Sequence, residues 1–111
     1  MYPVGGHLGK CLDMYPKERD TLHNLFVQNR ITAVFAGHEH LFNEHVKNGV
    51  RYIITGGGGA SLSPSIYGTG DFHHYVVVSV KGGKVEMKVV KPAQDGKPQE
   101  EILLTGSARR G

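Results

Sequence analysis

Two β-hairpin signals constrain the fold of this 111-residue chain more than any other feature. The pair Asn48-Gly49 is a strong two-residue turn signal, and it predicts strands at roughly 42–47 and 50–55. Further along, "HHYVVVSV" and "KVEMKVV" flank a glycine-containing turn at residues 81–83. Their nearly continuous apolar character predicts a second hairpin. The chain is therefore expected to be dominated by β-structure.

The segment before the first hairpin predicts one helix and one more strand. Glycine and proline punctuate the first fifteen residues, which favours a loop. Pro16 suits a first helical position, and a helix is expected near residues 17–29. Its apolar stripe has helical spacing: Leu22, Leu25 and Phe26. Residues 31–36 are too few for a helix and rich in β-formers, so they predict a buried strand. One main helix and at least five strands make a mixed, β-rich α/β fold.

Composition and charge limit which kinds of molecule this chain is expected to bind. The net charge of +3 is modest and its Lys and Arg residues are scattered, so no nucleic acid is implied. No apolar run approaches the ~18 residues of a membrane span. The single cysteine, Cys11, has no partner for an internal disulfide. The length suits one small domain or part of a larger one, and nothing in the sequence indicates a compartment.

The string "GHEH", Gly37 to His40, carries the chemistry. If the strand continues in extended form, His38 and His40 point to one side and Glu39 to the other. Two imidazoles on one side can share a metal ion or hold two adjacent ions. The alternative is that both are ordinary histidines at the end of a strand and bind no metal. The position just after a buried strand, where α/β proteins build their sites, favours the metal.

With these motifs the sequence resembles the calcineurin-like metallophosphoesterases, in the branch that includes purple acid phosphatases. The resemblance rests on "LHNLFVQNRITAVFAGHEHLF", "NGVRYIITGGGGA" and "HHYVVVSV", and it covers roughly residues 1–92. It implies half of a four-layer αββα sandwich, with residues 1–92 as the C-terminal part of the domain. Residues 93–111 are expected to form a polar, partly disordered tail that ends in "GSARRG".

The resemblance also implies a function. His38 and His40 match the family's metal ligands, within a site that holds two ions of iron, manganese or zinc. Such ions polarise a phosphoester substrate and generate a hydroxide nucleophile. No further catalytic residue is assignable, and this chain alone is expected to bind at most one ion weakly. Substrate identity is not indicated.

The sequence departs from the family pattern at several motifs. GDxxD and GNH[DE] are absent, and Met1 stands where the HxP histidine is expected, before Tyr2-Pro3. The one DxH string, Asp71 to His73, precedes a strand instead of following the first one, so it is interpreted as coincidence. The chain is therefore expected to be a fragment that is inactive alone. Its expected partner is the missing N-terminal half or another copy of itself.

The other histidines and the glycine run are interpreted as structural residues without a role in catalysis. His7 and His45 are expected on loop and hairpin surfaces, and His73 and His74 at the start of a strand. The glycines at 56–59 resemble a phosphate cradle, but no helix pattern follows them. They predict a tight turn beside the metal site instead.

Two alternatives remain open. A cupin-like barrel would use His38, His40 and Glu44 to bind one metal ion. Three features count against the barrel. Thr32 stands where the cupin pattern has a glycine upstream, and the next glycine, Gly49, comes too early. The second cupin motif cannot be assembled around Pro64. The other alternative is a non-catalytic fragment that self-associates through its sheets.

Overall fold

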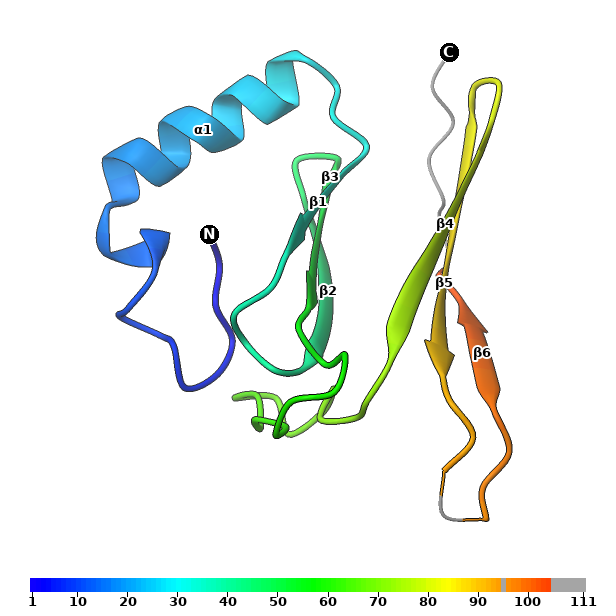
Figure 1. The fold of residues 1–111 in the computed structure, drawn as a ribbon. Helices are drawn as coiled ribbons and strands as arrows, with labels where there is room; N and C mark the ends of the chain where they lie inside the picture. The colour runs from blue at the N-terminus through cyan, green and yellow to red at the C-terminus, as the bar shows by residue number, and fades with distance from the viewer. Residues whose placement is uncertain (95, 105–111) are drawn as a thin grey trace.

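The computed structural model describes residues 1–94 and 96–104 of the chain as a mixed α/β fold in which strands dominate (Figure 1). A 3-10 turn at Leu12–Met14 precedes the helix α1 (Pro16–Gln28). Six strands follow: β1 (Ala33–Ala36), β2 (Phe42–Lys47), β3 (Val50–Thr55), β4 (Tyr75–Lys81), β5 (Lys84–Lys91) and β6 (Glu100–Leu103). Within the described ranges no helix is long and apolar enough to cross a membrane.

The strands form two separate sheets of three. The first has the order β1-β3-β2, with β1 parallel to β3 and β2 antiparallel to it. The second has the order β4-β5-β6 and is antiparallel throughout. Asn48 and Gly49 both have positive φ, 52° and 80°, as a two-residue turn between right-twisted strands requires. The first hairpin therefore forms where the turn signal predicts it.

The core lies between the two sheets. Ile53 of β3 packs there with Met87 and Val89 of β5, and all three are nearly inaccessible to solvent. Side chains alternate along β3, so Tyr52 and Ile54 face the other side of the first sheet. Ile54 packs there with Val4 of the N-terminal segment and Leu41. The order of layers is thus helix, sheet and sheet, as expected for part of an αββα sandwich (Figure 1).

Helix α1 is attached through a buried histidine together with part of the predicted apolar stripe. Leu22 and Phe26 are half-buried, and the centroid of the Phe26 ring lies 6.5 Å from that of Tyr52. Leu25 is exposed, and the one buried residue of α1 is His23. The Nδ1 atom of His23 lies 2.5 Å from the Tyr52 hydroxyl, and Nε2 lies 2.9 Å from Asn48 Oδ1. Burial, together with the neighbouring Tyr2, raises the pKa of Tyr52 to about 12, so this hydroxyl stays protonated. Both ring nitrogens of His23 are satisfied, and this permits its burial.

The C-terminal segment contributes more structure than the sequence predicts. The tail expected from residue 93 contains β6, which pairs with β5 from Lys88 to Lys91. Leu104 follows β6 and is buried in the core beside Met87. β4 begins at Tyr75, two residues later than expected, because His74 turns inward before the strand. The predicted disordered end, residues 106–111, lies outside the described residues.

One side of the sandwich is open. β1 pairs with β3, and β4 pairs with β5, so each is an outer strand of its sheet. Phe35 of β1 is 45% exposed, and on β4 Val78 and Val80 are 43% and 66% exposed. A cavity of about 310 Å³ lies between the two strands, with Phe35 and Val78 in its lining. The apolar interior therefore reaches solvent along this side.

Half-buried His45 and buried His74 predict that acid destabilises the fold. Burial lowers the pKa of His45, with contributions from the positive charge of Lys47, and burial also lowers the pKa of His74. In the unfolded chain both regain an ordinary pKa near 6.5. Below that pH the unfolded state therefore binds more protons than the folded state. The free energy of unfolding is greatest above that pH and falls as the pH drops.

Urea denaturation at about pH 8 and about pH 5 measures this change. The variant His45→Phe keeps the aromatic contact with Tyr52 and removes a titrating group. Its free energy of unfolding is expected to fall less on acidification than that of the unchanged chain. Stability that is constant or rises toward acid would show that these two histidines do not control it.

Candidate metal centre

The GHEH segment forms tight turns, so the expected extended conformation is wrong. β1 ends at Ala36, and the Glu39 N–H then bonds the Gly37 carbonyl at 2.9 Å. The Leu41 N–H bonds the Glu39 carbonyl in the same way, at 2.9 Å. His38, at the centre of the first turn, has φ of 75°, which side chains other than glycine rarely adopt. Alternation along a strand therefore does not set the directions of the side chains here.

The turn separates the three side chains by burial. Glu39 is 2% exposed, whereas His38 is exposed and His40 is half-buried. That the carboxylate and the imidazoles point to opposite sides stays a prediction. That both imidazoles face one concavity stays a prediction.

His40 has the orientation of a metal ligand. Its Nδ1 atom lies 2.8 Å from the Ser61 carbonyl oxygen, which has only lone pairs to offer. Nδ1 therefore donates the proton, and Nε2 retains its lone pair. A histidine that binds a metal normally has such a carbonyl or carboxylate partner on its other nitrogen.

His7 lies within the candidate centre, which the sequence did not predict. Its ring lies against that of His38, with 3.7 Å between the centroids and 40° between the planes. Its side chain is 27% exposed, and its Nδ1 atom lies 3.8 Å from Glu39 Oε2. It does belong to a loop, as expected, but the loop folds back over the GHEH turn. No spacing rule links two histidines so far apart in sequence.

Glu39 holds this loop in place. Its Oε1 accepts a hydrogen bond of 2.7 Å from the buried Val4 N–H, and Oε2 accepts one of 3.4 Å from the His7 N–H. The carboxylate thus joins the N-terminal segment to the turn between His38 and His40.

The glycines after β3 permit close packing against the GHEH turn. A Cβ atom on Gly56 would overlap the Glu39 carbonyl oxygen, and one on Gly57 would lie 2.7 Å from the His74 ring. The loop continues to Ser63, whose N–H bonds the His40 carbonyl at 3.0 Å. The elements that follow this loop in the described part of the chain are the strands β4, β5 and β6, and none is a helix. The glycines therefore serve close approach and not a P-loop.

The other acidic and imidazole groups are engaged elsewhere. Glu44 accepts a 2.8 Å hydrogen bond from Arg51, which removes it from the ligand set of the cupin alternative. His45 is half-buried and stacks on Tyr52, with 5.4 Å between the centroids. His73 Nε2 donates to the Ala60 carbonyl at 3.0 Å, and buried His74 lies 2.7 Å from the Thr55 hydroxyl. These contacts are structural.

The donor set suits a metal ion in part. No group of three or more His, Cys, Asp or Glu side chains with metal-binding geometry occurs in residues 1–94 and 96–104. His40 has a free Nε2 and an oriented ring, and His38 is accessible. A complete centre needs further ligands.

The close approach at Gly56 predicts a stability change with a matched control. Gly56→Ala is expected to lower the free energy of unfolding by roughly 1–3 kcal/mol, because the new methyl group must push the GHEH turn away. Gly58→Ala meets no atom within 4 Å and is expected to leave stability unchanged or to raise it by up to about 1 kcal/mol. Urea denaturation compares the two variants. Equal effects of both would refute the packing role.

Comparison with known proteins supports the fold. No protein-family model and no curated protein matches the chain. Among solved structures, vacuolar protein sorting 29 from Cryptosporidium parvum matches with a TM-score of 0.51 and 21% sequence identity. The match covers 80% of this chain and 44% of that one, so this chain spans less than half of the solved protein. At this identity the likeness shows the fold alone, which is a part of the calcineurin-like metallophosphoesterase fold.

Proposed function

We propose that this chain is the C-terminal part of a metal-dependent phosphoester hydrolase and that His38 and His40 are two of its metal ligands. The observation that carries the proposal is the bond between His40 Nδ1 and the Ser61 carbonyl. It fixes the tautomer in which Nε2 is free to bind a metal ion. The strings around "GHEH" support the purple acid phosphatase-like branch by resemblance.

The residues of this chain have distinct parts in the proposed site. His38 and His40 would hold iron, manganese or zinc, all of which accept imidazole. Two metal ions bound in the complete site would polarise the phosphoryl oxygens of the substrate. Glu39 would support the turn, because its carboxylate joins the turn to the backbone of Val4 and His7 in the N-terminal segment. Ser61 orients the ring of His40.

The remaining ligands would come from a second half of the fold. The open side of the sandwich, between β1 and β4, offers two outer strands and the exposed side chains of Phe35, Val78 and Val80. Strands added there would cover the apolar interior. In the absence of that half, a second copy of this chain is the proposed occupant.

The ligand count predicts metal binding without turnover. The isolated chain is expected to bind one zinc or manganese ion weakly, since two imidazoles leave most coordination positions to water. Hydrolysis of para-nitrophenyl phosphate and of its bis-ester is expected to be negligible. Isothermal titration calorimetry measures the binding, and release of nitrophenolate measures the turnover.

Single variants test the assignment. His38→Ala and His40→Ala are each expected to weaken metal binding by about tenfold or more. His73→Ala removes an imidazole that bonds the Ala60 carbonyl, and it is expected to leave affinity unchanged. Robust turnover would show that the site is already complete. Equal losses in all three variants would show that no particular pair of imidazoles holds the metal.

The open side predicts self-association of the isolated chain. Sedimentation velocity is expected to show dimers or larger species, because burial of exposed apolar area favours association. Val78→Lys combined with Val80→Lys places charges on the inner face of β4 and is expected to shift the population toward monomer. Ser79→Lys is the control, since its side chain points to the opposite face. A monodisperse monomer for the unchanged chain would contradict the prediction.

A further inference from the structure

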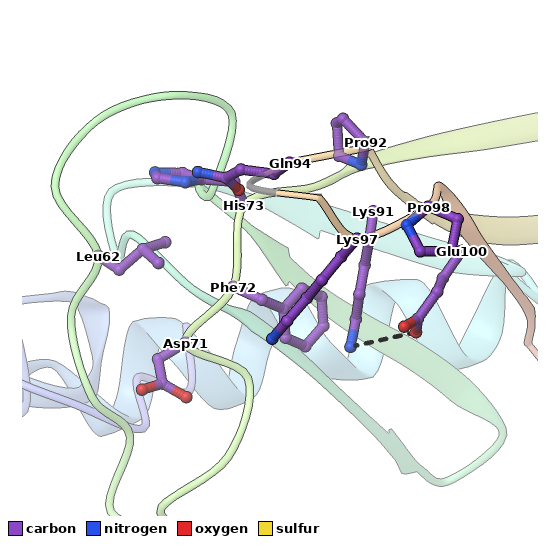
Figure 2. A pocket seen from close by; sticks show the side chains of 10 residues that line it. All are labelled: Leu62, Asp71, Phe72, His73, Lys91, Pro92, Gln94, Lys97, Pro98 and Glu100. Atoms are coloured by element: carbon purple, nitrogen blue, oxygen red, sulfur yellow. Dashed lines mark ion pairs between the residues drawn. The ribbon is translucent and has the colours of Figure 1, made fainter.

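A second cavity borders the glycine-rich loop at Leu62, and neither His38 nor His40 lines it. A cavity of about 440 Å³ separates the segment before β4 from the connection between β5 and β6 (Figure 2). This volume lies within the range of small-molecule sites in proteins. One wall comes from Leu62 and residues 71–73, and the other comes from residues at the ends of β5 and β6.

Lys91, at the end of β5, directs its ammonium group into the cavity. The Nζ atom lies 4.0 Å from the centre of the Phe72 ring and 3.9 Å from Glu100 Oε2. The first contact is a cation–π interaction. The second is a loose ion pair between partly exposed groups, which contributes little to stability, so a bound anion can replace it.

Lys97, on the other arm of the connection, lines the same cavity. Backbone hydrogen bonds of 3.0 Å and 2.8 Å join Gln94 and Lys97, which brings the start of the second arm back beside β5. In the view of Figure 2 the ammonium ends of Lys97 and Lys91 lie on either side of the Phe72 ring. Lys97 has no ion-pair partner among residues 1–94 and 96–104. Two lysines therefore line one cavity, and Lys97 brings a charge that no neighbouring carboxylate pairs within the described residues.

The rest of the lining is largely apolar. Leu62, Pro92, Pro98 and the Phe72 ring present carbon surface to the cavity. The lining also holds the carboxylates of Asp71 and Glu100, of which Glu100 makes the loose ion pair with Lys91. The cavity thus offers two ammonium groups to an anion, and its carbon surface suits a hydrocarbon or aromatic group.

We propose that this cavity binds a small organic anion, with its anionic head on Lys91 and Lys97 and its apolar body against Leu62, Phe72 and the prolines. Lysine donates from a point charge on a flexible stem, so both ammonium groups can reach one phosphoryl or carboxylate group. The apolar lining selects organic anions over inorganic ones, because burial of carbon surface adds to the charge attraction. The site uses neither His38 nor His40, so it does not rest on the proposed hydrolase function.

Phenylphosphonate is a suitable probe, since its carbon–phosphorus bond resists hydrolysis. Saturation-transfer NMR with EDTA present measures its binding and excludes a metal-held ligand. Binding is expected to saturate below about 10 mM, and methylphosphonate is expected to bind at least about threefold more weakly. Equal binding of the two probes, or no saturation, would overturn the proposal.

Charge-matched variants locate the site. Lys91→Gln combined with Lys97→Gln is expected to weaken binding by about tenfold or more. Lys81→Gln combined with Lys84→Gln removes the same charge at the far turn between β4 and β5, and affinity is expected to change by less than about twofold. All four lysines are partly or fully exposed, so both variants should fold. Equal losses in both would show general charge attraction and refute the site.

Discussion

The buried carboxylate of Glu39 is the interaction on which the arrangement of this molecule depends. A charge that is 2% exposed is costly unless hydrogen bonds compensate it, and Val4 and His7 supply them through their backbone N–H groups. The N-terminal segment must therefore lie over the GHEH turn. From that position Val4 covers Ile54, and Tyr2 reaches the aromatic group around Tyr52 that anchors α1. The outer layer of the fold thus depends on one side chain of the candidate site.

The same carboxylate explains why a strained turn persists at His38. A positive φ in a non-glycine residue persists when the surroundings hold it, and here the constraint acts from both sides. Glu39 is tied to the N-terminal segment, while its backbone carbonyl lies against Gly56 where a Cβ would not fit. His38 and His40 are consequently presented by a rigid turn. Rigid presentation is what a metal site requires of its ligands.

Local signals predicted the strands and the helix well because each has a cause close by in sequence. The first hairpin follows from the positive φ that Asn48 and Gly49 accept, and its strands match the expected ranges. Helix α1 starts one residue earlier than expected, at Pro16. β6 escaped prediction because "EEIL" carries no strand pattern of its own. It is a strand because β5 offers an edge and Leu104 can enter the core beside Met87.

In the candidate site, too, some features have local causes in the sequence and others depend on contacts between distant residues. A short motif reveals that two imidazoles and a carboxylate are adjacent in sequence, but a turn, and not alternation along a strand, sets their burial. The contact of His7 with His38 depends on a loop that returns across 32 positions to reach Glu39, and no local pattern encodes such a return. The Ser61 carbonyl is a backbone atom, so its bond to His40 leaves no mark on residue identity. Sequence therefore indicates which side chains are candidate metal ligands, while the groups that orient them emerge only from the folded chain.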